Sequence, residues 1–144
     1  MYTMEELKGY CYRCHKCRLA ETRTNVVFGE GSEHADIMFV GEGPGYYEDV
    51  QGRPFVGRAG QLLDKMIEAI NLKRSDTYIA NVVKCRPPEN RNPFEDESSV
   101  CLNYLRWQVK LIQPKIIVCL GAVAAKNLIN SDLSISRQRG QFVC

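Results

Sequence analysis

Four cysteines are placed along the chain where their thiolates could bind a metal together. Two form a close pair near the N-terminus and two lie far from it in sequence: Cys14, Cys17, Cys85 and Cys101. Four soft sulfur ligands suit either a structural zinc ion or an iron–sulfur cluster, and spacing alone does not choose between the two. A redox-active pair accompanied by buried thiols is the alternative interpretation.

The other three of the seven cysteines are expected to play different parts. Cys11 lies three residues before Cys14 and is the rival for a ligand position. Cys119 lies inside the apolar run 116–120, which predicts that it is buried in the core. Cys144 is the last residue of the sequence and is not expected to bind the metal.

A long loop rich in Gly and Pro is the second region whose residues could do chemistry. It spans residues 41–60, follows the apolar run 37–40 and leads into a helical pattern. In open α/β sheets, ligands bind at the carboxyl ends of the strands, where this loop begins. Long loops without regular structure are usually functional, and Glu42 and Phe55 are the most informative side chains of this one.

The elements that must position these residues alternate between strands and helices. Strands are predicted at 36–40, 77–83 and 115–120, and helices at 60–71, 96–112 and 122–130. This alternation predicts an α/β fold of three layers, with a small central parallel sheet covered by helices on both faces. We expect residues 1–144 to form a single domain, because the chain has the length of one domain and no linker.

Three local patterns add detail to this fold. Residues 26–28 predict a short strand, and residues 134–144 look like the start of a further strand-and-turn unit. In the helix at 60–71, five apolar residues are predicted to share one face: Leu62, Leu63, Met66, Ile67 and Ile70.

Composition excludes a membrane protein but does not by itself identify a polyanionic partner. The chain has 19 basic and 17 acidic residues, a formal net charge of +2, and no apolar run close to the roughly 20 residues of a membrane span. Because it also lacks a signal peptide, we expect a soluble, cytoplasmic protein, in which structural disulfides are rare. The basic residues form three local groups that could bind phosphate, namely Arg13, Lys16, Arg18 and Arg23, then Lys84, Arg86 and Arg91, and finally Arg137 and Arg139.

The motifs in these segments resemble those of the family-4 uracil-DNA glycosylases, the iron–sulfur branch of that superfamily. The resemblance covers almost the whole chain and rests on motifs in the same order, at residues 24–31, 41–60, 81–88, 90–93 and 120–122. It implies a uracil-DNA glycosylase-like fold and a DNA-repair hydrolase that releases uracil from single- or double-stranded DNA. It also implies that Cys14, Cys17, Cys85 and Cys101 hold a 4Fe–4S cluster, with zinc as the alternative.

The same resemblance implies a role for each residue of a base pocket. Phe55 would stack on the flipped uracil, and the Asn81 amide would pair with its O4 and N3–H. Glu42 would position water beside the sugar carbon, and Glu48 would fill the space beside C5 and so disfavour thymine. The implied catalytic residues are thus Glu42 and Asn81, and the implied substrate-binding residues are Gly41, Gly43, Glu48, Phe55 and Asn81.

The sequence departs from the family pattern at its end and in the loop. It stops at Cys144 without the family's His-Pro motif, and it has Tyr46 and Tyr47 where relatives often carry acids. Losing one electrostatic donor costs roughly 10²–10³ in rate, so we expect poor cleavage and a sheet without its C-terminal edge strand. A catalytically weak uracil- or DNA-binding module is the alternative function, and a zinc-stabilised structural protein is the third. In each case we expect a monomer.

Overall fold

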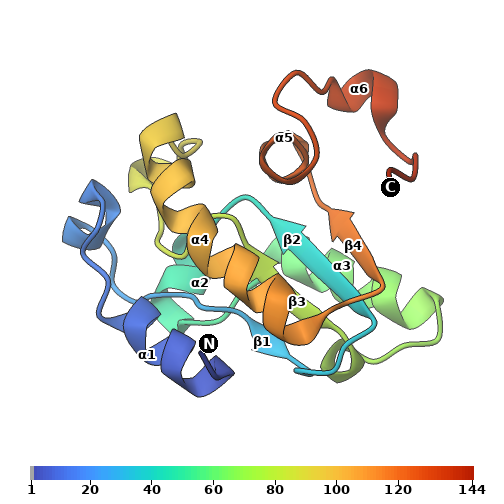
Figure 1. Ribbon diagram of the computed structural model, residues 1–144, viewed down its shortest axis with the longest axis horizontal. Helices are drawn as coiled ribbons and strands as arrows, with labels where there is room; N and C mark the ends of the chain where they lie inside the picture. Colours follow the sequence, from blue (N-terminus) through green and yellow to red (C-terminus); the bar gives the residue numbers. More distant parts are fainter. Residues whose placement is uncertain (1) are drawn as a thin grey trace.

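Three strands predicted from apolar runs form the parallel part of the sheet in the computed structural model, which describes residues 2–144 (Figure 1). The central strand β2 (Ile37–Gly41) is parallel to β3 (Tyr78–Asn81) on one side and to β4 (Ile116–Cys119) on the other. A short strand β1 (Glu30–Gly31) adds an antiparallel edge, which gives the order β1-β3-β2-β4. The expected parallel sheet is therefore confirmed for three of its four strands.

The predicted strand at residues 26–28 is wrong. Val26, Val27 and Phe28 are buried, as an apolar run should be, but their backbone groups do not join the sheet. The Val27 N–H donates to the Lys84 carbonyl (2.7 Å), and the Phe28 carbonyl accepts from Nε2 of Gln108 (2.8 Å). The apolar run therefore fills the core as an extended segment, and the strand begins only at Glu30.

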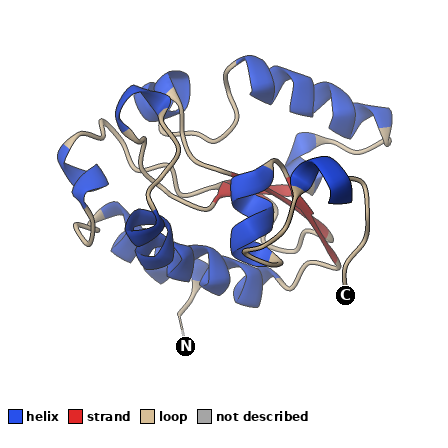
Figure 2. Ribbon diagram, turned by 90° about the horizontal axis from the view of Figure 1, so that it is seen from above, coloured by secondary structure: helices blue, strands red, loops and turns tan. Residues whose placement is uncertain are grey.

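Helices cover both sides of the sheet (Figure 2). They are α1 (Met4–Tyr12), α2 (Tyr46–Gln51), α3 (Arg58–Ala69), α4 (Glu95–Ile112), α5 (Ala122–Leu128) and α6 (Ile135–Gln138). Among residues 2–144, none of these helices is both long and apolar enough to cross a membrane. The strand-and-turn unit predicted for residues 134–144 is wrong, because this segment holds α6 and no strand.

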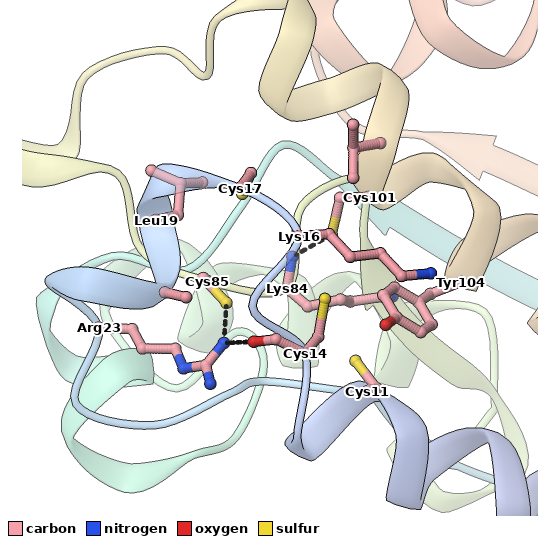
Figure 3. A pocket seen from close by; sticks show the side chains of 12 residues that line it. Cys11, Cys14, Lys16, Cys17, Leu19, Arg23, Lys84, Cys85, Cys101 and Tyr104 are labelled. Carbon is pink, nitrogen blue, oxygen red and sulfur yellow. Dashed lines mark hydrogen bonds between the residues drawn. The ribbon is translucent and has the colours of Figure 1, made fainter.

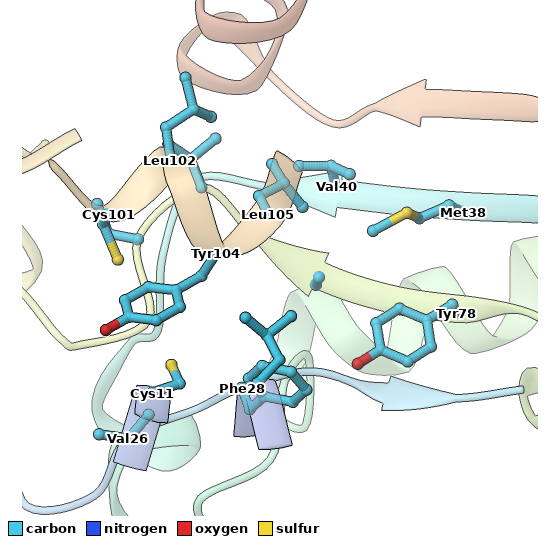
Figure 4. Close-up of a cluster of buried hydrophobic side chains, with 14 of the residues drawn as sticks. Cys11, Val26, Phe28, Met38, Val40, Tyr78, Cys101, Leu102, Tyr104 and Leu105 are labelled. Atoms are coloured by element: carbon cyan, nitrogen blue, oxygen red, sulfur yellow. The ribbon is translucent and has the colours of Figure 1, made fainter. Parts of the chain in front are cut away.

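Alternation along β2 divides the core between the two faces of the sheet. Met38 and Val40 belong to a large cluster with residues of α1 and α4, whereas Phe39 packs with Leu63 and Ile67 of α3. Figure 4 shows the larger cluster, in which Cys11 and Cys101 lie at the same end. The core on the α4 side therefore continues into the region that carries the predicted metal ligands.

The apolar face predicted for α3 is only partly buried. Leu63 and Ile67 are buried against the sheet, but Leu62, Met66 and Ile70 are each more than half exposed. Neighbouring residues of a helix point about 100° apart, so Leu62 and Leu63 cannot both face a narrow sheet. One apolar stripe of this helix thus covers the sheet and the other faces solvent.

Candidate active site and cysteine cavity

The ends of two adjacent parallel strands bring the predicted base-pocket residues together. Gly41 at the end of β2 pairs in register with Asn81 at the end of β3. The two segments that follow β2 and β3 stay side by side beyond the sheet. The Val82 N–H donates to the Gly41 carbonyl (2.9 Å), and the Val83 N–H donates to the Glu42 carbonyl (3.1 Å). Glu42 is therefore held at the sheet edge where ligands bind in this class of fold.

Phe55 returns from the long loop to the same point. A Cβ added to Gly41 would lie 2.4 Å from Cζ of Phe55 and 2.6 Å from Oδ1 of Asn81. Both contacts are far too close for a side chain, so position 41 requires glycine. The aromatic ring and the amide thus both lie against the backbone of Gly41.

The Asn81 side chain is buried, with one polar atom unpaired among the described residues. It is only 2% exposed, and within residues 2–144 its buried Oδ1 atom has no hydrogen-bond partner. A buried amide oxygen without a donor costs about 1–3 kcal/mol, and native proteins rarely leave one without a reason. A ligand that donates an N–H at this point would recover that free energy.

Phe55 has a strained backbone that other residues hold in place. Its φ angle is +50°, a left-handed value that is uncommon for an aromatic residue. The Arg74 guanidinium donates to the Phe55 carbonyl (2.8 Å) and also to the Pro54 carbonyl. A Cβ on Gly60 would lie 1.9 Å from the Phe55 oxygen, so this turn also depends on a glycine. Strain of this kind is concentrated at functional sites.

Glu42 is a half-buried acid beside this pocket. Burial raises the pKa of its carboxyl above the usual value, because the ionised form loses hydration. Gly43, the next residue, lies against the Val83 side chain and brings the loop backbone to the same edge. The arrangement can therefore offer a carboxylate and backbone N–H groups close to a bound ring.

Glu48 braces the loop from inside. Its Oε1 accepts from the Gly45 N–H (3.0 Å), and its Oε2 accepts from the N–H groups of Val56 (3.0 Å) and Gly57 (2.8 Å). One carboxylate thus ties the start of the loop to the segment just after Phe55. Its placement beside C5 of a bound base stays a prediction.

We expect Glu48→Ala to lower the free energy of unfolding by about 2–3 kcal/mol, because three backbone N–H groups lose their acceptor. Urea unfolding followed by circular dichroism measures this. Glu68→Ala, which removes an exposed carboxylate from α3, is the control and should change stability by less than about 0.5 kcal/mol. Equal effects of the two substitutions would contradict the bracing role.

Five cysteines, rather than four, line one cavity between the N-terminal segment, the loop after β3 and α4 (Figure 3). They are Cys11, Cys14, Cys17, Cys85 and Cys101. All are free thiols, and across residues 2–144 no group of three His, Cys, Asp or Glu side chains is arranged to hold a single metal ion. Sulfur atoms from these three segments therefore line a single cavity.

Hydrogen bonds already reach two of these sulfurs. Arg23 Nη1 donates to Sγ of Cys85 (3.4 Å) and to the Cys14 carbonyl (2.7 Å), and the Lys84 N–H donates to Sγ of Cys101 (3.2 Å). Such outer contacts orient metal ligands and tune them. Burial raises the pKa of both Cys11 and Cys101 to about 12, so these thiols favour the neutral form until a cation compensates the thiolate charge.

The remaining two cysteines lie outside the cavity. Cys144 is exposed, and Cys119 is half-buried rather than fully buried as predicted. Cys119 belongs to β4, an outer strand of the sheet, so it stays partly exposed although it lies in an apolar run.

Comparison with known proteins identifies the fold family. Residues 28–143 match the family model of the uracil DNA glycosylase superfamily. The chain is 48% identical to the type-4 uracil-DNA glycosylase of Archaeoglobus fulgidus over 98% of its own length and 73% of the relative. The corresponding enzymes of Sulfurisphaera tokodaii and Thermotoga maritima are 49% and 48% identical, over 66% and 76% of their lengths. The chain belongs to the uracil DNA glycosylase superfamily.

The prediction that Lys84 belongs to a group of basic residues that could bind phosphate is wrong. That side chain is 1% exposed, and its Nζ donates to the Asn81 carbonyl (2.9 Å) and to Oε1 of Gln108 (2.7 Å). Burial lowers the pKa of Lys84 to about 8. Arg91 is also engaged, with both guanidinium ends on Glu97 (2.8 and 2.9 Å). Of this group, Arg86 alone is neither buried nor paired with an acid among the described residues.

Sequence reasoning missed three residues that support the glycosylase site. Lys84 and Gln108 hold the backbone of Asn81 from within the core, and Arg74 holds Phe55. A polar residue in the middle of an apolar helix pattern was the available signal for Gln108. Nothing local marked Lys84 or Arg74, because each is defined by partners from other elements.

Proposed function

We propose that this chain is a uracil-DNA glycosylase of DNA repair, which hydrolyses the N-glycosidic bond of deoxyuridine in DNA and releases uracil. The observation that carries the proposal is the buried Oδ1 of Asn81, which has no hydrogen-bond partner among the described residues and lies beside Gly41 together with the Phe55 ring. The three relatives compared above, each a type-4 uracil-DNA glycosylase by name, support it.

Base recognition would rest on the Asn81 amide and the Phe55 ring. The amide carries one acceptor and one donor, so it can accept from the uracil N3–H and donate to O4. Cytosine presents the opposite pattern at these positions and would leave buried groups unpaired. Phe55 would stack on the flipped base, which must leave the helix to reach the pocket.

Glu42 would act on the water that attacks the sugar carbon. As the N-glycosidic bond breaks, positive charge develops on the sugar and negative charge on the leaving uracil. An ionised Glu42 beside the sugar would orient the water and stabilise the positive charge, and the Gly43 N–H would face the base. Glu48 would brace the loop and lie beside C5. The reaction then needs no covalent enzyme intermediate.

Four of the cavity cysteines would hold a 4Fe–4S cluster, namely Cys14, Cys17, Cys85 and Cys101. The sulfur atoms that line one cavity suit such a cluster, and the resemblance to the family-4 uracil-DNA glycosylases favours it over zinc. When bound, the cluster would serve as a structural cross-link between the N-terminal segment, the loop after β3 and α4. Cys85 lies four positions after Asn81, so this cross-link would also fix the loop next to the base pocket. The chemistry itself would be carried by the pocket residues.

An excision assay on a DNA strand with a single uracil tests the function. Two substitutions test whether Asn81 sets the choice of base and Phe55 the affinity for it. We expect Asn81→Asp to lower kcat/KM for uracil by about 10- to 100-fold and to reduce the preference for uracil over cytosine, because a carboxylate cannot donate to O4. We expect Phe55→Ala to weaken binding by about 1–3 kcal/mol without changing the preferred base.

The control for these substitutions is Asn103→Asp, an exposed change on α4 that should leave kcat/KM unaltered. Binding of the same strand is measured alongside excision. Tight binding without any release of uracil by the unsubstituted chain would contradict the enzymatic function and favour a binding module. Equal losses of selectivity from Asn81→Asp and Phe55→Ala would contradict the separate roles.

A further inference from the structure

Two exposed aromatic rings lie beside the proposed base pocket without any evident role in packing. Tyr46 and Tyr47 are the first two residues of α2 and are 54% and 61% exposed. Their ring centroids are 5.3 Å apart at an interplanar angle of 88°. The pair thus presents aromatic surface to solvent on side chains of low conformational entropy.

The pair is fixed next to the pocket by the loop that carries Phe55. The position that a Cβ would take on Gly57 lies 3.6 Å from Cδ2 of Tyr47, and Gly57 follows Phe55 by two residues. Glu48, the next residue after Tyr47, hydrogen-bonds to the N–H groups of Val56 and Gly57. Tyr47 therefore borders the segment that holds the stacking ring, rather than a distant surface.

A cation completes this surface. The Arg86 guanidinium carbon lies 5.5 Å from the centroid of the Tyr46 ring, and its Nε donates to Oδ1 of Asn90 (2.7 Å), which orients it. Arg86 directly follows Cys85 in the loop after β3, so the cation and the rings come from different segments of the chain. We name Tyr46, Tyr47 and Arg86 the aromatic ledge.

We propose that the aromatic ledge stacks on the base that neighbours the uracil in the same DNA strand. This inference rests on the proposed function, because a flipped uracil leaves its neighbour with one face free of stacking. Aromatic side chains beside a cation are the usual recognition surface for unpaired bases, in which ring stacking holds the base and the guanidinium faces the backbone phosphate. Glu89, an exposed acid of the adjacent turn, is the nearby charge that would oppose the phosphate.

A double-mutant cycle tests the stacking role of the aromatic ledge, because it compares Kd values when the tyrosines, the neighbouring base or both are removed. The probe is a single strand with one 2′-fluorinated deoxyuridine, which resists excision, and the neighbouring base is either present or replaced by an abasic spacer on the 5′ or the 3′ side. We expect the double substitution Tyr46→Ala, Tyr47→Ala to raise Kd about tenfold when both neighbouring bases are present. On the strand with the spacer on the stacked side, the same substitution should raise Kd less than twofold.

Two control proteins keep the result specific to stacking. The double substitution Tyr46→Phe, Tyr47→Phe keeps both rings and should bind within twofold of the unsubstituted chain. Tyr12→Ala removes an exposed tyrosine of α1 that also has a cation near it, Lys8 at 5.6 Å, and should leave Kd unchanged. All measurements are made at one salt concentration, because phosphate contacts are salt-dependent.

The outcomes separate the ledge from the glycosylase function. Equal rises in Kd on strands with and without the neighbouring bases, or no rise at all, would overturn the ledge even in an active enzyme. Coupling between the ledge and one neighbouring base supports it. Excision is measured separately on a strand with ordinary deoxyuridine, so a chain that shows the coupling but releases no uracil would overturn only the function.

Discussion

Glu42→Gln is expected to lower kcat/KM for uracil excision by about 10²–10⁴-fold, the usual contribution of a positioned acid or base. The amide keeps the size of the side chain but cannot carry the negative charge that would orient water and face the developing positive sugar. Affinity for a strand with the excision-resistant 2′-fluorinated deoxyuridine should stay within about threefold. A Gln variant that keeps nearly full kcat/KM would contradict the role of Glu42.

The pH dependence gives this prediction a second readout. Burial raises the pKa of Glu42, so the carboxyl of the free protein takes up its proton at a higher pH than an exposed glutamate does. In the proposed mechanism the ionised form is active, so kcat/KM should fall on the acid side at a pH above the usual glutamate range. The Gln variant should lack this acid limb, whereas Glu33→Gln, an exposed control, should keep it.

The cysteine substitutions are expected to have the second large effect, which is the loss of all bound iron. Changing any one of the four proposed ligands to Ser should abolish the iron and its broad visible absorbance after anaerobic reconstitution. These four changes are Cys14→Ser, Cys17→Ser, Cys85→Ser and Cys101→Ser. Loss of the cluster should also expose the N-terminal segment to proteolysis, because metal binding is coupled to folding.

Cys11→Ser is the sharpest control that the chain offers. Cys11 lines the same cavity and is buried at the end of α1, yet it is not a proposed ligand. We expect Cys11→Ser to keep its iron, and Cys119→Ser, on β4, to keep it as well. Loss of iron from Cys11→Ser together with retention by Cys14→Ser would show that the ligand assignment is wrong. Stoichiometric zinc in place of iron in the unsubstituted protein would overturn the cluster.

The order of elements and the position of the site could be predicted from the sequence. Short apolar runs bounded by Gly, Pro and polar residues predicted three strands, and these strands form the parallel part of the sheet. The family resemblance placed Gly41 and Asn81 in one base pocket, and the register of β2 and β3 puts the two residues side by side. Two cysteine groups were likewise visible as candidates before the fold brought them to one cavity.

Local pattern was insufficient where burial depends on a partner far away in the sequence. Lys84 lies in a run that reads as a basic surface, but inside the core its Nζ donates hydrogen bonds to Oε1 of Gln108 on α4 and to the Asn81 carbonyl. The short strand β1 was misplaced because the buried run before it bonds to Gln108 and Lys84 instead of to the sheet. In each case the deciding hydrogen bond joins segments that only the fold brings together.

The sequence by itself determined the apolar runs, the loop chemistry and the candidate ligands, because these depend on residue type and on spacing along one segment. The tertiary structure alone decided which stripe of α3 is buried, how Arg74 and Glu48 hold the loop, and that Tyr46 and Tyr47 lie free beside Phe55. The physical reason is that periodicity shows which residues share a face of an element. Only packing shows whether another element covers that face, and whether a polar group there finds its partner.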